Sequence, residues 1–242
     1  MESVKNLVEY YDELYPVTLA QQTFYETLVQ KYPHPAKILG IGCGTGVLCH
    51  RLAKDAVDAT GLETQRELLE SANLKYRSQL MSLRYFQMST LEMTRFLGKK
   101  FYNIISCLNS RVIFIHDKTL IKKFFFDCKE LLTDDGMLVL QLFNFEKYKA
   151  NPKCALPELS SARVLYKSEL TRLFDGTFKL DTFLEKNGKT IPVYERADVY
   201  PLQKSEIQEF SKEAGFKSAQ FFGGFDGLAA DKDSDSLLAV IS

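Results

Sequence analysis

The chain has 242 residues, of which 45% are hydrophobic and 26% charged, as in an ordinary globular protein with a sizeable core. Its 31 basic and 31 acidic side chains cancel, which excludes a global field that attracts nucleic acid or an anionic membrane. The five cysteines form no Cys-x-x-Cys pair, which argues against structural zinc or a disulfide framework and fits a reducing cytosol. The N-terminus has no apolar signal core, and no apolar run could span a membrane. We therefore expect a cytoplasmic protein without a metal and without nucleic-acid or membrane partners.

The first 145 residues predict a helical segment followed by alternating strands and helices. Apolar side chains recur at helical spacing over residues 3–14 and 18–31, and Pro33 and Pro35 end this region. The strands predicted next span residues 38–41, 57–62, 83–87, 102–108 and 137–143, and the helices span 47–54, 65–79 and 118–132. This alternation predicts βαβ crossovers and a doubly wound, mostly parallel sheet.

The pattern changes after residue 145. Residues 146–160 predict a loop, because Pro152 and Pro157 interrupt a charged stretch. The antiparallel strands predicted next span residues 162–170, 178–185 and 190–200, with Asn187-Gly188 as a two-residue hairpin turn. A helix over 202–214 and strands over 216–222 and 237–241 complete the chain. The insertion is expected to be a small sheet that covers one edge of the domain.

The most specific motif is Lys-Ile-Leu-Gly-Ile-Gly-Cys-Gly-Thr-Gly at residues 37–46. Four glycines occupy every second position where a strand runs through a tight turn into a helix. Glycine at such a place lets a ligand touch the backbone. A dinucleotide site requires Gly-x-Gly-x-x-Gly, and no frame of this segment supplies that spacing. The motif therefore favours a ligand other than a dinucleotide.

This decapeptide resembles the first motif of class I S-adenosylmethionine-dependent methyltransferases. The order of the later elements resembles the same fold over most of the chain, with the antiparallel insertion found in small-molecule methyltransferases. The resemblance implies an α/β fold with a doubly wound, seven-stranded, mostly parallel sheet, an N-terminal helical cover and an inserted antiparallel sheet. The expected single domain, residues 1–242, comprises the cover (1–35), a nucleoside-binding half (36–145), the insertion (146–201) and a C-terminal part (202–242).

The resemblance also implies which residues bind S-adenosylmethionine. Glu63 stands at the end of the second strand, where the family places an acidic residue whose two oxygens bind both ribose hydroxyls. The other interpretation of Glu63 is a solvated charge at a helix start. The segments after the third and fourth strands correspond to those around adenine and methionine, and residues 10–15 resemble a segment that folds over the cofactor. The predicted cofactor-binding residues are Gly40, Gly42, Cys43, Gly44, Gly46, Glu63, Thr64, Gln87, Met88, Ser89, Cys107, Asn109, Tyr11 and Tyr15.

Two positions depart from the family pattern. Gly40 stands where the family has a carboxylate that helps hold the methionine ammonium, and Met88 stands where an Asp often contacts the adenine amine. Each lost charge-assisted contact weakens binding by about 1.5–3 kcal/mol. A degenerate, non-catalytic module that binds the nucleoside for regulation or partner binding is therefore an open alternative. A nicotinamide-dependent oxidoreductase is disfavoured by the missing third glycine.

Methyl transfer from a sulfonium requires alignment of acceptor, methyl and sulfur, and a general base only when the acceptor arrives protonated. The candidate catalytic residues are Tyr11, Arg111 and His116, each with a structural alternative: a core tyrosine, a surface arginine and a helix start. Tyr166, Tyr194 and Arg196 line the acceptor pocket if the insertion covers it, although strand alternation turns some of them to solvent. The sequence thus predicts methyl transfer to N or O of a small-molecule acceptor. It predicts neither the acceptor nor the oligomeric state.

Overall fold

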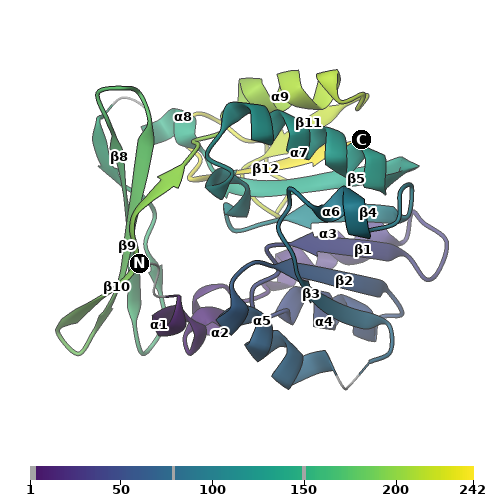
Figure 1. Cartoon of the computed structure of the whole chain (residues 1–242), viewed down its shortest axis with the longest axis horizontal. Coiled ribbons are helices and arrows are strands. Elements are labelled where there is room, and N and C mark those ends of the chain that lie inside the picture. Colours follow the sequence, from purple (N-terminus) through teal and green to yellow (C-terminus); the bar gives the residue numbers. More distant parts are fainter. Residues whose placement is uncertain (1–3, 78–79, 149–150) are drawn as a thin grey trace.

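The computed structural model describes residues 4–77, 80–148 and 151–242 of the chain. These residues form a seven-stranded sheet flanked by helices and a second, five-stranded sheet beside it (Figure 1). The short helices α1 (Lys5–Val8) and α2 (Tyr11–Leu14) lie between the two sheets. The predicted fold class is confirmed. Within the described ranges, no helix combines the length and the apolar character needed to cross a bilayer.

The large sheet has the strand order of a doubly wound fold. Its strands are, in order, β11 (Ala219–Phe222), β12 (Ser236–Ile241), β5 (Leu132–Phe143), β4 (Tyr102–Cys107), β1 (Lys37–Ile41), β2 (Asp58–Glu63) and β3 (Leu83–Gln87). β12 runs antiparallel to both of its neighbours, whereas the other pairings are parallel. The chain moves outward from β1 in both directions, so the order reverses between β1 and β4. Ligands of open α/β sheets bind beyond the carboxyl ends of the strands at such a switch point.

Alternate side chains of the same strands pack on opposite faces of the large sheet. In β1, Leu39 joins one buried cluster with Phe124 and Phe210, and Ile38 joins another with Tyr25. The helices that contribute to these clusters are α3 (Leu19–Val29), α4 (Val47–Lys54), α6 (Met93–Phe96), α7 (Lys118–Leu131) and α9 (Lys204–Glu213). This two-sided burial explains why the parallel strands are almost continuously apolar in sequence.

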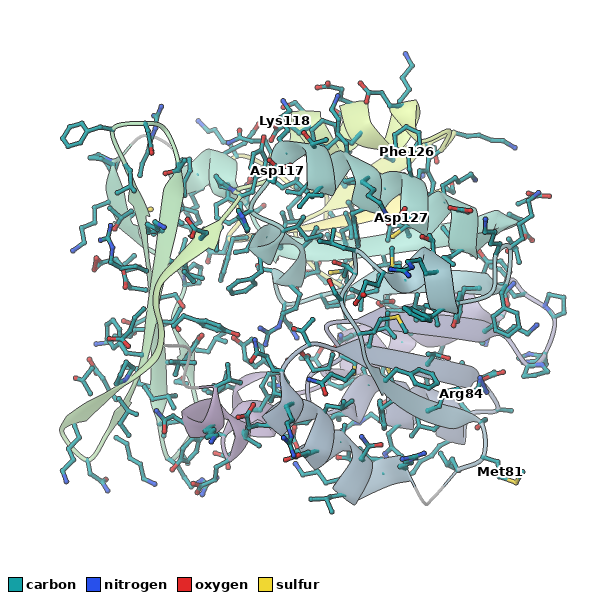
Figure 2. The ribbon with its side chains drawn as sticks, in the orientation of Figure 1. Met81, Arg84, Asp117, Lys118, Phe126 and Asp127 are labelled. Carbon is teal, nitrogen blue, oxygen red and sulfur yellow. The ribbon has the colours of Figure 1, made fainter. Side chains whose placement is uncertain are left out.

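Helix α7 shows how one helix divides a run of three phenylalanines. Phe124 and Phe125 are buried against the sheet, whereas Phe126 is 49% exposed. Figure 2 shows Phe126 on the outer side of α7. The helix begins with Asp117, whose Oδ1 accepts a hydrogen bond from the backbone N–H of Leu120 at 2.9 Å. This contact confirms that the His116-Asp117 pair marks a helix start.

The second sheet is the predicted insertion. Its strands are β6 (Lys153–Ala155), β7 (Leu159–Ser160), β8 (Leu165–Arg172), β9 (Phe178–Lys186) and β10 (Lys189–Val199). Asn187 and Gly188 make the predicted turn with φ values of 50° and 71°. The expectation of a plain loop over 146–160 is wrong for its described residues, which hold the end of α8 (Phe145–Tyr148) together with β6 and β7. Both strands form because they pair with β8, a contact that local sequence does not reveal.

Two predicted helices are interrupted. The helix expected over residues 3–14, of which residue 3 lies outside the described ranges, is divided between α1 and α2. Arg163 of the insertion donates to the carbonyl of Glu9 at 3.3 Å, and the N–H of Glu13 bonds to the carbonyl of Tyr10 instead of that of Glu9. The helix expected over 65–79 comprises α5 (Arg66–Ala72) and a π-helical turn, Asn73–Arg77, while residues 78–79 lie outside the described ranges.

Gly46, at the start of α4, provides a test of the packing below the glycine-rich turn. Its φ is +81°, and a Cβ there would lie 2.3 Å from the hydroxyl oxygen of Tyr85. Gly176 has a similar φ of +84° but faces open space. Gly46→Ala and Gly176→Ala both incur a left-handed backbone cost of about 1–2 kcal/mol. Only Gly46→Ala adds an overpacking cost of about 1–3 kcal/mol. Urea unfolding should therefore show the larger loss for Gly46→Ala, and equal losses would contradict this packing.

Candidate cofactor and acceptor site

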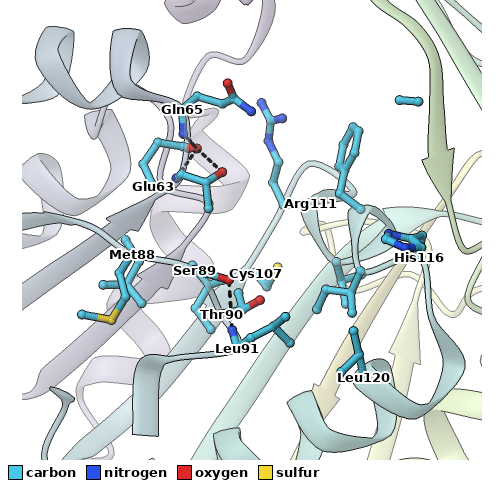
Figure 3. Close-up of a pocket in the computed structure, with 18 of the residues that line it drawn as sticks. Glu63, Gln65, Met88, Ser89, Thr90, Leu91, Cys107, Arg111, His116 and Leu120 are labelled. Carbon is cyan, nitrogen blue, oxygen red and sulfur yellow. Dashed lines mark hydrogen bonds between the residues drawn. The ribbon is translucent and has the colours of Figure 1, made fainter. Parts of the chain in front are cut away.

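A cavity of about 450 Å³ lies beyond the carboxyl ends of β1, β2 and β4, at the switch point of the large sheet. Its walls come from strand ends, from the loop after β3 and from the segment after β4. Figure 3 shows Glu63 and Gln65 on one side of this cavity, His116 on the other, and Arg111 extending between them. Met88 and Leu91 add apolar surface near the third strand. The position and size are typical of a nucleotide-sized ligand site.

The carboxylate of Glu63 is held in place by backbone donors. Oε2 accepts a hydrogen bond from the N–H of Gly44 at 2.9 Å. Oε1 accepts from the N–H groups of Thr64 at 2.8 Å and Gln65 at 3.0 Å. Glu63 is only 4% exposed, yet it contributes to the cavity wall. The hydroxyl of Thr64 also donates to Oε1, at 3.4 Å. Each carboxylate oxygen offers about two acceptor positions, and Oε2 accepts only from Gly44 among the described residues, so Oε2 has capacity for a ligand hydroxyl. Glu63 is therefore a fixed acceptor and not a solvated surface charge.

The glycines of the turn are needed because two side chains lie directly on its backbone. At Gly42, with φ +65°, a Cβ would lie 2.7 Å from Cγ of Arg111. At Gly44, with φ +59°, it would lie 2.4 Å from the ring of Tyr11. The cover reinforces this contact, because Asp12 accepts a hydrogen bond from the hydroxyl of Thr45 and forms an ion pair with Lys75. The N-terminal segment thus closes over the turn.

Arg111 joins three parts of the chain. It begins the short 3-10 helix Arg111–Phe114 after β4. Its Nη2 donates to the hydroxyl of Tyr11 at 3.2 Å, and its Nη1 donates to the hydroxyl of Tyr194 at 3.4 Å. Its Nε is buried and has no hydrogen-bond partner among the described residues. Arg111 is therefore a cation inside the site whose hydrogen-bond partners are neutral tyrosines.

A second cavity of about 250 Å³ lies between the N-terminal cover, the segment after β4 and the inserted sheet. It shares Arg111, Phe114 and Tyr194 with the larger cavity. Its walls are rich in aromatic rings and neutral polar groups. These include Tyr15, Gln21, Gln141, Phe143, Tyr166, Ser168 and Thr182. The insertion therefore forms part of a pocket, as expected. Tyr166 and Tyr194 line it, whereas Arg196 is exposed.

The tyrosines around these cavities are hydroxyl donors at neutral pH. Burial raises the pKa of Tyr11 and Tyr15. Burial also raises the pKa of Tyr166 to about 12. A phenol with a raised pKa keeps its proton and does not act as a base near neutrality. In the larger cavity His116 is the imidazole in the wall, but no histidine, Asp or Glu is among the described residues that line the 250 Å³ cavity.

The structure distributes the predicted cofactor residues over adjoining spaces. The residues that line the 450 Å³ cavity are Gly42, Glu63, Thr64, Met88, Ser89 and Cys107. A neighbouring space of about 70 Å³ is lined by Tyr11, Tyr15, Gly40, Gly42, Cys43 and Asn109, among others. Gln87 lies in neither, because its side chain is exposed and donates to the carbonyl of Thr64 at 3.3 Å. Gly44 and Gly46 lie beneath Tyr11 and Tyr85.

Sequence reasoning missed several wall residues. Gln141 is a polar residue within the apolar run of β5, and its Oε1 accepts a hydrogen bond from the N–H of Asn109 at 2.7 Å. That interruption of an apolar strand was a usable signal. Gln21 and Phe114 gave no comparable signal, because a glutamine on an amphipathic helix and a phenylalanine after a strand are common.

The reactivity of the five cysteines tests whether their side chains are buried as the structure shows. Burial raises the pKa of Cys43, Cys49, Cys107, Cys128 and Cys154, to about 12 for Cys49 and Cys107. Within the described ranges, no group of three or more metal-ligating side chains is present. The thiolate is the reactive form, so a raised pKa slows alkylation near pH ~8. Labelling with a thiol reagent should be much slower in the native protein than in denaturant. A native thiol that reacts as fast as the denatured protein would contradict this assignment.

Comparisons with known proteins agree with this geometry. Residues 38–136 match the sequence profile of a family described as Methyltransferase domain. The chain is 27% identical over 130 residues to a putative methyltransferase of Geobacillus sp. strain WCH70, covering 53% of this chain and 51% of the relative. Over 72 residues it is 35% identical to a ubiquinone biosynthesis O-methyltransferase of Vibrio vulnificus, covering 30% of each. The aligned region thus spans about half the length of the first relative and less of the second.

Solved structures extend the likeness to nearly the whole chain. An S-adenosylmethionine-dependent methyltransferase from Clostridium acetobutylicum superimposes with a TM-score of 0.74 at 16% identity, covering 98% of both chains. The sugar N-methyltransferase KedS8 from Streptoalloteichus gives 0.68 at 14% identity, covering 99% of this chain and 93% of the other. At such identities the likeness concerns the fold. The chain therefore has the fold of the class I S-adenosylmethionine-dependent methyltransferases, and its residues 38–136 match the methyltransferase-domain profile.

Proposed function

We propose that this protein transfers the methyl group of S-adenosylmethionine to a nitrogen or oxygen of a small molecule. The observation that carries the proposal is the Glu63 carboxylate, anchored by three backbone N–H groups and lining a cavity at the switch point of the sheet. That cavity shares wall residues with a second, aromatic pocket of about 250 Å³. A donor site beside an acceptor site is what group transfer requires.

The described residues fit S-adenosylmethionine by the chemistry of their donors and acceptors. Glu63 would accept a hydrogen bond from the ribose through Oε2, which accepts only from the N–H of Gly44 among the described residues. Met88 and Leu91 would contact the adenine ring, which needs an apolar surface. The backbone at Gly42 and Cys43 would face the methionine part, beside the neutral amides of Gln21 and Asn109. These assignments preserve the order of the family motif.

The glycine at position 40 has a steric reason. A Cβ at Gly40 would lie 2.8 Å from Sγ of Cys49, which is buried in α4. A carboxylate-bearing residue at position 40 is therefore incompatible with Cys49 in its present place. The neutral amides of the 70 Å³ space would have to serve the methionine ammonium instead, and neutral hydrogen bonds are weaker than charge-assisted ones.

S-adenosylmethionine supplies both the methyl group and its own leaving group, so the residues of this chain chiefly position the acceptor and exclude water. The cover would contribute to this exclusion, because Tyr11 packs on the glycine-rich turn and Tyr15 lines the adjoining 70 Å³ space. The 250 Å³ pocket lacks a basic carboxylate or imidazole among its described residues. An acceptor atom held there must therefore present a free lone pair on arrival. Proximity and orientation can lower the barrier by up to about 7–11 kcal/mol.

The alternative function is a non-catalytic nucleoside-binding module, and Gly40 and Met88 favour it because each lacks the expected carboxylate. The two proposals differ in one observable. An enzyme converts S-adenosylmethionine to S-adenosylhomocysteine with some acceptor of a metabolite panel, whereas a module binds the nucleoside without turnover.

The ribose assignment predicts the effect of Glu63→Gln. The amide has no charge and replaces one acceptor oxygen by a donor, so affinity for S-adenosylhomocysteine should fall roughly ten- to a hundredfold. Isothermal titration calorimetry measures this loss. Glu70→Gln, on the exposed side of α5, is the matched control and should bind as the wild type does. Unchanged affinity of a folded Glu63→Gln protein would remove Glu63 from the ribose site.

The steric account of Gly40 predicts a compensating pair of substitutions. Gly40→Asp alone should destabilise the protein, because its Cβ collides with Cys49. Gly40→Asp combined with Cys49→Ala removes the collision and adds a carboxylate near the methionine ammonium. The double variant should bind S-adenosylhomocysteine roughly tenfold more tightly than Cys49→Ala alone. Equal affinities in the two proteins would contradict the placement of the ammonium beside position 40.

A further inference from the structure

We propose that the acceptor of this protein carries a carboxylate and that Arg111 binds it. This inference rests on the proposed function and specifies its substrate class: a small carboxylate with an apolar or aromatic body. It depends on the charge of the acceptor pocket, on the partners of Arg111 and on its place between the two cavities.

The formal charge in the wall of the acceptor pocket is positive. Among the described residues that line the 250 Å³ cavity, Arg111 is the one with a formal charge, and the remaining walls are aromatic, aliphatic or neutral polar. Neutral walls of this kind do not screen a cation as water does. A ligand that enters this pocket therefore meets a positive field, which Glu63 in the wall of the adjoining cavity offsets only in part. This field favours an anion over an amine cation.

The Arg111 side chain has N–H donors that the described residues do not use fully. Two tyrosine hydroxyls accept from its Nη1 and Nη2 at 3.4 and 3.2 Å, and its buried Nε has no partner in the part of the chain that the structure describes. Glu63 acts on Arg111 through space, but no described carboxylate forms an ion pair with it, so the desolvation of the buried guanidinium is offset only in part. Its planar fork matches a carboxylate in a bidentate manner. A ligand carboxylate would take up the unused Nε donor and form the direct ion pair that the described residues do not supply.

The place of Arg111 connects this anion to the reaction. Arg111, Phe114 and Tyr194 belong to the walls of both cavities. An acceptor whose carboxylate contacts Arg111 would have its body between Phe114 and the tyrosines of the insertion, beside the donor cavity. A carboxylate bound at Arg111 would also lower the repulsion between the Arg111 cation and the cationic sulfonium of S-adenosylmethionine.

A carboxylate at Arg111 has a second source, the methionine carboxylate of the cofactor itself. The two sources are separated by probes that lack one of them. 5′-Methylthioadenosine keeps the nucleoside but has no amino-acid carboxylate, whereas S-adenosylhomocysteine has it. Benzoate and phenylacetate carry a carboxylate on an apolar body, and benzamide and phenylacetamide are their neutral counterparts of similar shape.

The test measures binding of these probes to the protein saturated with S-adenosylhomocysteine, by saturation-transfer nuclear magnetic resonance and calorimetry at millimolar concentration. The wild type should bind at least one carboxylate roughly tenfold more tightly than its amide. Arg111→Met keeps the apolar stem and should lose this preference, while the ratio of its affinities for S-adenosylhomocysteine and 5′-methylthioadenosine should match that of the wild type. Arg172→Met, at an exposed position of β8 outside both cavities, is the matched control and should behave as the wild type.

Each of the other possible results contradicts one specific part of the proposal. A wild type that binds S-adenosylhomocysteine but shows no preference for either carboxylate overturns the acceptor assignment and leaves the proposed function intact. An Arg111→Met protein that loses S-adenosylhomocysteine but not 5′-methylthioadenosine assigns Arg111 to the cofactor carboxylate, which also overturns it. A folded wild type that binds neither nucleoside contradicts the proposed function.

Discussion

The hydrogen bonds between Glu63 and three backbone N–H groups are the constraint on which the site depends. They connect the end of β2 to the glycine-rich turn after β1 through Gly44, and to the start of the next helical segment through Thr64 and Gln65. A buried carboxylate is tolerated only when donors satisfy it, so the turn and the strand end are positioned together. The remaining acceptor capacity of the carboxylate then faces a cavity instead of solvent.

Arg111 is the corresponding element beside the 250 Å³ pocket. Its stem lies on Gly42, and its guanidinium bonds to Tyr11 of the cover and Tyr194 of the insertion. Three segments far apart in sequence therefore meet at one cation. This explains why the chain places a left-handed glycine at position 42 even before a ligand is considered. It also makes the geometry of the acceptor pocket sensitive to the cover and to the insertion together.

Much of this could be predicted from the sequence, because it depends on local patterns. The alternation of apolar strands and amphipathic helices gives the large sheet, and the spacing of the glycines with Glu63 gives the switch-point site. Other features depend on tertiary contacts that no local pattern encodes. Strands β6 and β7 form by pairing with β8, the break before α2 follows from Arg163, and Gly40 is matched to Cys49 across the sheet–helix interface. The hydrogen bonds of Arg111 with Tyr11 and Tyr194 likewise depend on tertiary contacts.

The central claim is that Glu63 and the turn it holds form the nucleoside site. The most direct measurement is nuclear magnetic resonance of the backbone amides while S-adenosylhomocysteine is added. Because the amides of Gly44, Thr64 and Gln65 donate to the Glu63 carboxylate, a ribose bound there must perturb them. The account predicts saturable shifts at these amides and at neighbours in the 450 Å³ cavity. Absence of shifts at millimolar ligand, or shifts confined to another surface, would contradict it.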